Sequence, residues 1–322
     1  MGDWVAGCDS QRNAGSAHQL FHQMSSMSAA PKYQLVNGYK FAPAFTDIAD
    51  SLTYEALPDD LFIVTYPKNG TTWTQIIVTL ILHDGDMPEA YEKEGLWRVS
   101  PFLEANGKQA AMDAKRPCAI KTHLSYELQP KHPNAKYIVV TRNAKDACVS
   151  FYYHQTMFKG YGIEGMDFHD FLPFWLKGEV ECGNYFDFTL TWWKERHNPN
   201  ILLIVYEEMK SDPAASIVKI AEFLGQEYAD KLKANNNEVL NKVVAKSSFK
   251  ATKDKLNGDF LARIPTTAFT EGSPRRFARK GIVGDWKNHF TAEESHATDQ
   301  VFHEKFDGTG LDDVWAEYGI FS

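Results

Sequence analysis

The hydrophobic positions of this chain change their spacing from segment to segment, and the changes predict alternating strands and helices. Short apolar runs at residues 61–64, 119–120, 137–140 and 201–205 have the length and composition of strands buried in a parallel sheet. Residues 73–81 instead place apolar side chains at i, i+3, i+4, i+7 and i+8, which is typical of an amphipathic helix. The alternation predicts an α/β fold with a central parallel sheet flanked by helices.

Two further helices are predicted from the signals at their ends. Asp212 and Pro213 suit the N-cap and first position of a helix that Gly225 closes. Thr291-Ala292-Glu293-Glu294 has the pattern of a capping box, which predicts the start of the last helix.

One long segment interrupts this rhythm. Residues 255–281 show little periodicity and contain Gly258, Pro265, Gly272, Pro274 and Gly281. A loop of this length in a compact domain is usually a functional lid or disordered. It ends in a basic cluster at residues 275–281. This cluster favours the first alternative, a lid that covers an anionic ligand.

Length and composition favour one large domain. The chain has 322 residues, of which 43% are hydrophobic and 24% charged, enough for one sizeable core. Residues 1–30 are rich in Ser, Ala, Gly and Gln, so we predict a flexible N-terminal tail there and one domain over residues 31–322. His18 and His22 lie one helical turn apart in this tail but lack further ligands, and we predict no metal site.

Charge and cysteine usage exclude several classes of partner. Lys plus Arg number 34 and Asp plus Glu 42, so the formal net charge is 34 − 42 = −8, without the basic stripe of a nucleic-acid binder. No apolar stretch approaches the roughly 18 residues of a membrane span. The four cysteines are scattered, and with no leader pattern we expect a cytoplasmic protein. The glycosylation sequon at Asn69 is then a chance match.

The segment TYPKNGTTW, residues 65–73, is the first candidate binding site. It follows a predicted strand and opens a predicted helix, a geometry that presents backbone N–H groups to an anion. Lys68 precedes Gly70, the reverse of the order in a Walker A loop, and no nearby Asp offers a magnesium ligand. The alternative is a helix start whose lysine faces solvent, and this loop alone leaves both open.

Two more segments place polar groups after strands. Lys121-Thr122-His123 follows the second strand, where His123 is either a general base or an ordinary surface histidine. Arg142 follows the third strand, where it either binds phosphate or pairs with Asp146. Because parallel strands end at one edge of a sheet, the three segments together favour a shared anion site.

These motifs resemble those of the cytosolic sulfotransferases, and the similarity extends over roughly residues 35–322. The matching segments, in the order of that family, are Tyr66–Trp73, Lys121–Leu124, Arg142–Asp146 with Ser150, and Arg279–Lys287. The resemblance implies a single α/β domain of the P-loop nucleotide-kinase type. It also implies transfer of a sulfuryl group from 3′-phosphoadenosine 5′-phosphosulfate, leaving 3′-phosphoadenosine 5′-phosphate.

The same resemblance assigns roles residue by residue. The donor-binding residues it implies are Lys68, Asn69, Gly70, Thr71, Thr72, Trp73, Arg142, Ser150, Tyr206, Ser247, Phe249, Arg279, Lys280 and Gly281. His123 is the implied general base, with Lys121 and Lys68 offsetting charge at the transferring group. No metal is implied, which agrees with the missing magnesium ligand.

The chain departs from the family pattern at informative places. Asn69 occupies a position that is usually serine. The family dimer motif K-x-x-x-T-V-x-x-x-E keeps Lys287 and Thr291, but Ala292 and His296 replace its last two members. A homodimer is therefore possible but in doubt.

The acceptor is the least determined part of the prediction. We expect a small aromatic or apolar molecule with a hydroxyl or amine, such as a phenol, catecholamine, sterol or other alcohol. Its walls are either built from Phe102, Phe151, Tyr152, Tyr153, Phe158 and Tyr161, or these side chains belong to the core. Three rival functions stay open: a silent sensor of 3′-phosphoadenosine 5′-phosphate, a metal-dependent nucleoside or nucleotide kinase, and sulfonation followed by elimination.

Overall fold

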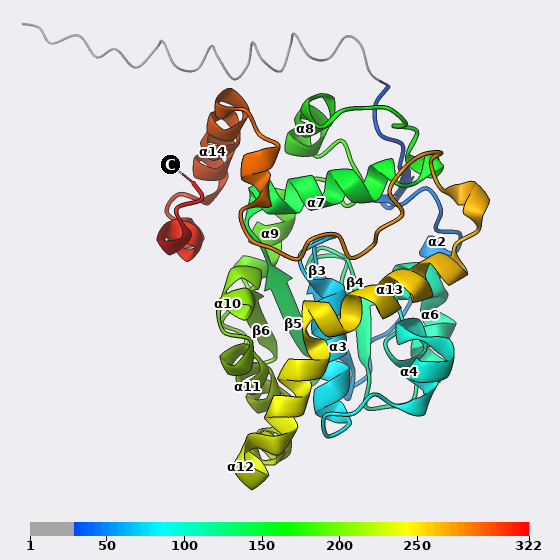
Figure 1. Cartoon of the computed structure of the whole chain (residues 1–322), viewed down its shortest axis with the longest axis vertical. Helices are drawn as coiled ribbons and strands as arrows, with labels where there is room; N and C mark the ends of the chain where they lie inside the picture. Colours follow the sequence, from blue (N-terminus) through cyan, green and yellow to red (C-terminus); the bar gives the residue numbers. More distant parts are fainter. Residues whose placement is uncertain (1–28, 322) are drawn as a thin grey trace, which may run out of the picture.

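Four parallel strands form the centre of the fold in the order β4–β3–β5–β6, in a computed structural model that describes residues 29–321 (Figure 1). They are β3 (Leu61–Thr65), β4 (Ala119–Thr122), β5 (Lys136–Thr141) and β6 (Ile201–Val205). Each contains one of the predicted apolar runs. Leu61 pairs in register with Ala119 and Lys136, so the carboxyl ends of the strands lie together. A separate antiparallel hairpin joins β1 (Gln34–Val36) and β2 (Tyr39–Phe41).

Alternate residues of the strands enter two different hydrophobic cores. Phe62 and Val64 of β3 pack with the cluster that includes aromatic side chains of α7, α8 and α9. Leu61 and Ile63 face the opposite cluster, built with α3, α11 and α12. This period of two shows that both faces of the sheet are covered, as the continuous apolar runs predict.

The helices cover these faces and the edges of the sheet. They are α2 (Ile48–Ser51), α3 (Thr71–Leu82), α4 (Glu89–Glu94), α5 (Leu96–Val99), α6 (Leu103–Asp113), α7 (Ala144–Thr156), α8 (Phe168–Lys177), α9 (Tyr185–Trp193), α10 (Tyr206–Ser211), α11 (Pro213–Leu224), α12 (Gln226–Ser247), α13 (Phe249–Arg263) and α14 (Ala292–Phe306). Short 3₁₀ segments are η2 (Lys159–Tyr161), η3 (Thr266–Ala268), η4 (Asp285–Asn288) and η5 (Asp312–Tyr318). The backbone of α12 leaves helical geometry at residues 234–237.

The helix-end predictions are confirmed. The Asp212 side chain accepts a hydrogen bond from the backbone of Ala215, Pro213 begins α11, and Gly225 ends it. Thr291 and Glu294 form the reciprocal capping box at the start of α14. Both ends are set by local hydrogen bonds, which is why the local sequence predicts them.

The predicted loop over residues 255–281 is wrong in its first third. Helix α13 continues to Arg263, and the irregular segment begins at Ile264. Thr252 is the one buried residue of α13, so this helix lacks the apolar stripe that reveals other helices. The remaining segment, which we call the lid (residues 264–281), passes between α13 and α7 in Figure 1.

No helix among residues 29–321 is long and apolar enough to cross a membrane. The predicted tail falls almost entirely outside the described residues, as do His18, His22 and Cys8. Cys118, Cys148 and Cys182 are buried free thiols.

Candidate active site

The turn from β3 to α3 is narrow and needs glycine. Gly70 caps α3 with φ of 100°, in the left-handed region. A Cβ atom there would lie 2.8 Å from Cδ2 of Tyr206, so this ring closes one side of the turn. Thr71 hydrogen-bonds the Thr65 hydroxyl at 2.6 Å, joining the start of α3 to the end of β3. The exposed amino end of α3 therefore has the geometry of an anion site.

Lys68 extends from this turn beneath the lid. Its Nζ lies 4.4 Å from the centre of the Phe277 ring and 3.4 Å from the Phe277 carbonyl oxygen. Burial, together with the charges of Lys121, Arg142 and Arg279, lowers the pKa of Lys68 to about 7. The charges that shift the pKa of Lys68 are all positive, which suits this position to an anionic ligand.

Lys121 lies at the end of β4, on the same edge of the sheet. Its Nζ is 3.7 Å from the centre of the Phe102 ring. Burial lowers its pKa to about 8, although the carboxylates of Glu104 and Glu181 act in the opposite direction. Both lysines keep partial solvent exposure, so the ligand surface reaches them.

His123 is held in one orientation by three contacts. Its Nδ1 lies 2.7 Å from the carbonyl oxygen of Thr65, its backbone N–H donates to Glu104 Oε1 at 2.6 Å, and its carbonyl accepts from Tyr39 at 2.8 Å. A carbonyl oxygen only accepts, so Nδ1 carries the hydrogen and Nε2 is left as an acceptor. Burial, with the charges of Lys121 and Lys68, holds the pKa of His123 well below its usual range. His123 is therefore a neutral imidazole, and no hydrogen bond to its Nε2 is found among residues 29–321.

Arg142 joins several parts of the site. Its guanidinium carbon lies 4.5 Å from the centre of the Tyr206 ring, and it donates to the carbonyl oxygens of Lys68 at 3.3 Å and Ile282 at 3.0 Å. The ion pair with Asp146 that the sequence left open is present at 3.7 Å. Asp146 has other partners as well, because its carboxylate also accepts hydrogen bonds from the backbone N–H groups of residues 284 and 286.

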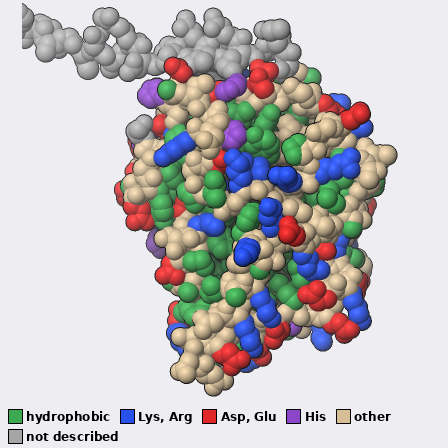
Figure 2. All heavy atoms as spheres, viewed as in Figure 1, with side chains coloured by type: hydrophobic (Ala, Val, Ile, Leu, Met, Phe, Trp, Pro, Cys, Tyr) green, Lys and Arg blue, Asp and Glu red, His purple; other side chains and the backbone are tan. Residues whose placement is uncertain are grey.

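The end of the lid carries a second basic group. Arg279 and Lys280 each lie 2.6 Å from a carboxylate oxygen of Asp285. Burial opposes ionisation of Asp285, but hydrogen bonds from Lys280, Asn288 and Arg279 hold its pKa below the usual range. Figure 2 shows Lys and Arg side chains gathered across the middle of this face. Asp285 therefore holds two cations at the end of the lid.

The other predicted donor residues lie around these cations. Trp73 and Tyr206 have ring centres 5.7 Å apart, edge to face. A Cβ atom on Gly281 would lie 2.6 Å from the Phe249 ring, which brings the lid onto the start of α13. Ser247 is buried at the end of α12, Ser150 is half-buried in α7, and Thr72 is half-buried in the first turn of α3.

Comparison with known proteins decides the family. Residues 58–310 match the model of the sulfotransferase domain. This chain belongs to the sulfotransferase family. It is 35% identical to Sulfotransferase 1C2 of Oryctolagus cuniculus over 81% of this chain and 87% of that protein. It is 34% identical to Sulfotransferase 1C2 of Homo sapiens over 89% of this chain and 97% of that protein.

Solved structures agree on the fold. Mouse sulfotransferase SULT7A1, complexed with PAP, is 26% identical with a TM-score of 0.68, and the match covers 89% of this chain and 99% of that one. Retinol dehydratase, in a complex with retinol and PAP, matches at 22% identity and a TM-score of 0.67, over 91% of this chain and 95% of that one. The protein is thus an enzyme that transfers a sulfuryl group from 3′-phosphoadenosine 5′-phosphosulfate to an acceptor.

The candidate site contains buried polar atoms without hydrogen-bond partners within residues 29–321, and their chemistry suits this donor. Among the described residues, buried polar atoms without a hydrogen-bond partner include Asn69 Oδ1, Trp73 Nε1, Arg142 Nε and Arg279 Nε. Three of these four atoms are N–H donors, which suits phosphate oxygens and nucleobase acceptors. Buried groups of this kind are normally satisfied, so their concentration here indicates a ligand that completes the site.

Sequence reasoning missed several residues that the fold brings to the sulfotransferase site. They are Glu104, His154, Glu181, Phe277 and Asp285. Asp285 lies within the Arg279–Lys287 motif and Phe277 lies two residues before it, so their place in the sequence was a usable signal. Glu104, His154 and Glu181 carry no such signal because they reach the site from α6, α7 and the α8–α9 connection.

The expected acceptor walls divide between the two alternatives. Phe151 and Tyr152 pack against Phe171 in the core, as the alternative interpretation has it. Phe102 lies against His123 with ring centres 5.0 Å apart. Phe158 stacks on Phe269 of the lid at 5.4 Å. Tyr153 lies under Arg279, and Tyr161 donates a hydrogen bond to Glu181.

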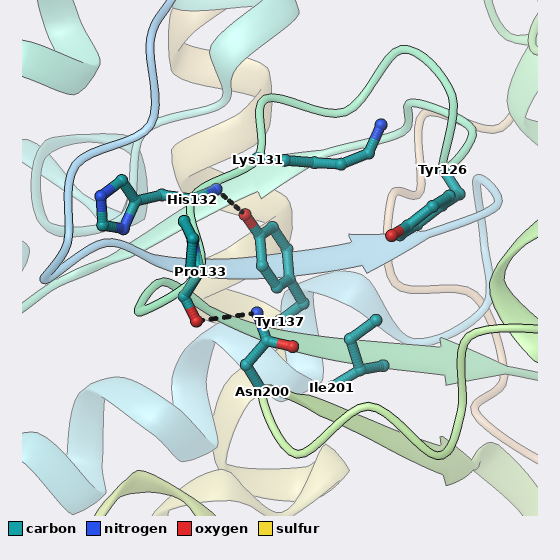
Figure 3. Close-up of a pocket in the computed structure, with 7 residues that line it drawn as sticks. All are labelled: Tyr126, Lys131, His132, Pro133, Tyr137, Asn200 and Ile201. Atoms are coloured by element: carbon teal, nitrogen blue, oxygen red, sulfur yellow. Dashed lines mark hydrogen bonds between the residues drawn. The ribbon is translucent and has the colours of Figure 1, made fainter.

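A hollow of about 240 Å³ lies at the opposite end of the sheet (Figure 3). Its lining residues are Tyr126, Lys131, His132, Pro133, Tyr137, Asn200 and Ile201. Tyr137 is the second residue of β5 and Ile201 the first of β6, whereas Lys68 and Arg142 follow the ends of β3 and β5. The Tyr137 hydroxyl accepts from the backbone of His132 at 3.0 Å. None of the predicted site residues lines this hollow.

Proposed function

We propose that this sulfotransferase sulfonates a hydroxyl or amine of a small acceptor, with His123 as the general base. The observation that carries the proposal is the state of His123, a neutral imidazole with its Nδ1 hydrogen directed to Thr65 and with charge effects from both Lys68 and Lys121. A general base of this kind contributes typically about 10²–10⁴-fold to rate.

The bound donor supplies the sulfuryl group, whose S–O bond to the 5′-phosphate breaks as a bond to the acceptor oxygen or nitrogen forms. His123 Nε2 takes the proton that the acceptor loses. Lys68 and Lys121 offset negative charge at the reacting group, in place of a metal ion. Lys68, Asn69, Gly70, Thr71 and Thr72 hold the phosphosulfate end.

The opposite end of the donor is assigned to the second basic group. Arg142, Ser150, Arg279, Lys280 and Gly281 hold the 3′-phosphate, and Trp73, Tyr206, Ser247 and Phe249 enclose the adenine. This assignment is supported by the contacts of Tyr206 with Gly70 and Arg142, and of Phe249 with Gly281.

The acceptor is proposed to have an aromatic or apolar body. Phe102 lies directly against His123 and Lys121, and Phe277 lies over Lys68. A flat ring between these phenylalanines would present its hydroxyl to His123. The free buried cysteines support the proposal that the enzyme works in a reducing, cytoplasmic setting.

The test is the His123→Ala variant. We expect sulfonation of a phenol panel to fall about 10²–10⁴-fold while the Kd for 3′-phosphoadenosine 5′-phosphate changes less than about threefold. Calorimetry measures binding and labelled donor measures transfer. The exposed His296 gives a matched control, His296→Ala, which should change neither. Equal losses of binding and transfer in His123→Ala would contradict the base role.

The same assay separates the rival functions. A sensor binds 3′-phosphoadenosine 5′-phosphate but sulfonates no acceptor in a panel of phenols, catecholamines, sterols and retinoids. A kinase shows turnover of ATP that requires Mg²⁺. Sulfonation followed by elimination gives a dehydrated product in place of a stable sulfate ester.

A further inference from the structure

Two polar side chains that the proposed reaction does not use lie beside its catalytic groups. His154 is in the last turn of α7, and Glu181 is in the connection between α8 and α9. The charge of Glu181 raises the pKa of Lys121, and the charges of Lys68 and Lys121 lower the pKa of His154. An apolar acceptor site has no need for either side chain at this place.

His154 enters the site between aromatic rings. Its ring centre lies 5.3 Å from that of Phe158 and 6.3 Å from that of Phe277, the ring that also covers Lys68. Nδ1 of His154 is buried and has no hydrogen-bond partner among the described residues. The side chain as a whole keeps partial exposure, so a ligand can reach it.

Glu181 is linked to His123 through the next residue, Cys182, and through Tyr39. Its neighbour Cys182 contacts Tyr39, whose hydroxyl donates to the carbonyl oxygen of His123 at 2.8 Å. Cys182 has φ of 62°, a left-handed conformation that is uncommon outside glycine and that turns the chain sharply here. The Glu181 carboxylate itself is buried and accepts from Tyr161 at 2.5 Å through Oε2.

One more buried polar atom in this region lacks a partner. Glu104 Oε2 is buried without a hydrogen bond among residues 29–321, and the charge of Glu104 acts on Lys121 as that of Glu181 does. The side-chain amide of Gln155, which follows His154, instead reaches Glu181 and lowers the pKa of that carboxyl. A buried polar group left without a partner is costly, so Glu104 Oε2 and Nδ1 of His154 together favour a ligand that carries polar groups over a wholly apolar one.

We propose that His154 and Glu181 bind a second hydrogen-bonding group of the acceptor, a hydroxyl or amino group next to the hydroxyl that is sulfonated. Glu181 accepts a hydrogen bond from this group, and Nδ1 of His154 pairs with it or with a neighbouring polar atom. The preferred acceptors are therefore small aromatic diols and amino alcohols, ahead of sterols and other acceptors with one polar group. This inference rests on the proposed function, since it concerns the acceptor of the same reaction.

Four acceptors of nearly equal size test the inference. Phenol, 2-methylphenol, catechol and 2-aminophenol share one reacting ring and differ in the adjacent position. We expect catechol and 2-aminophenol to exceed 2-methylphenol at least tenfold in kcat/KM, and at least tenfold in affinity for the complex with 3′-phosphoadenosine 5′-phosphate. Because 2-methylphenol fills the same space, the difference reports hydrogen bonding. Equal values for the three substituted phenols would overturn the inference.

Variants assign the effect to the two side chains. Glu181→Gln and His154→Phe should each reduce the ratio of catechol to 2-methylphenol roughly tenfold and leave the affinity for 3′-phosphoadenosine 5′-phosphate unchanged. Glu179→Gln, two residues from Glu181, and the exposed His197→Phe are matched controls that should keep the wild-type ratio. An unchanged ratio in both site variants would refute the assignment.

The binding measurements separate this inference from the proposed function. If no acceptor is sulfonated, the proposed function fails, while the affinities in the nucleotide complex still decide the inference. If all four acceptors are sulfonated at similar kcat/KM, the proposed function stands and the inference fails. Should a variant lose nucleotide binding through misfolding, the wild-type comparison of the four acceptors decides alone.

Discussion

At the scale of single residues, the chemistry of the site depends on which groups keep their charge. Lys68 has few counter-charges and three cations near it, and burial with these charges lowers its pKa to about 7. The lysine is therefore partly neutral in the free enzyme at neutral pH. A bound polyanion favours the protonated form, so binding and proton uptake are linked.

This linkage predicts that ligand binding takes up protons, and it sets the pH range in which it does so. Below about pH 6 Lys68 is already protonated in the free enzyme, so it takes up no proton on binding. At about pH 8 it is mostly neutral in the free enzyme, so its uptake approaches one proton. Lys68→Arg carries a permanent charge. We expect it to take up nearly one proton fewer than the wild type when 3′-phosphoadenosine 5′-phosphate binds at pH 8. Calorimetry in buffers of different ionisation enthalpy measures the number of protons.

Lys305→Arg is the matched control for this prediction, because Lys305 pairs with Asp187 at the surface, far along the chain from the β3–α3 turn. It should bind with the wild-type proton uptake. The linkage is contradicted if Lys68→Arg and the wild type take up equal numbers of protons at pH 8.

Single residues also mark the limit of sequence-based prediction. Lys68, His123 and Arg142 follow directly after apolar runs, and the geometry of parallel sheets predicts that they share an edge. Glu181 and His154 do not follow strands, so the geometry of the sheet does not predict where they lie. Their position depends on Tyr161, Tyr39 and the lid packing against them, which are contacts between distant parts of the chain.

At the scale of elements, the β3–α3 turn requires glycine at one position for two reasons, its backbone conformation and the close approach of a neighbouring ring. Gly70 has φ of 100°, and the Tyr206 ring would lie 2.8 Å from an added Cβ. An alanine there meets both backbone strain and a steric clash. The clash displaces Tyr206, which also lies under Arg142. The turn thus links helix geometry to the binding residues.

We expect Gly70→Ala to weaken binding of 3′-phosphoadenosine 5′-phosphate at least tenfold and to destabilise the fold by about 1–3 kcal/mol. Gly308→Ala separates the two causes, since Gly308 has φ of 74° with nothing within 4 Å of an added Cβ. That control should show only the strain, a loss of about 1–2 kcal/mol, with wild-type binding. Chemical denaturation and calorimetry give the two quantities. Wild-type nucleotide affinity in Gly70→Ala would refute the role of close approach.

The elements also show why part of the fold escaped prediction. The strands and α3 bury continuous or periodic apolar positions, so their sequence reveals them. In α13 single apolar side chains make separate contacts: Phe249 lies against Gly281, and Phe260 packs against Phe158 and Phe277. A helix whose contacts are made by a few side chains toward the lid has no periodic stripe.

At the scale of the whole molecule, an acidic protein presents a basic site. The formal net charge is −8, yet Lys68, Lys121, Arg142 and Arg279 influence one another at the carboxyl end of the sheet. Charges beyond about 8–10 Å are largely screened at physiological ionic strength. Under the proposed function, the local cluster governs donor binding, and the overall charge governs solubility and non-specific contacts.

The surface at the start of α14 supports a prediction of the oligomeric state. The family dimer motif keeps Lys287 and Thr291 here, but the hydroxyl and backbone N–H of Thr291 are both hydrogen-bonded to Glu294 in its own capping box. Ala292 and His296 are exposed and offer neither the apolar nor the acidic contact of the motif. We expect a monomer of 36.5 kDa by gel filtration with light scattering. The double variant Ala292→Val with His296→Glu restores both motif residues and should shift the mass toward twice that value. A wild-type protein that elutes at the dimer mass would show that another surface, or the motif in this altered form, supports the dimer.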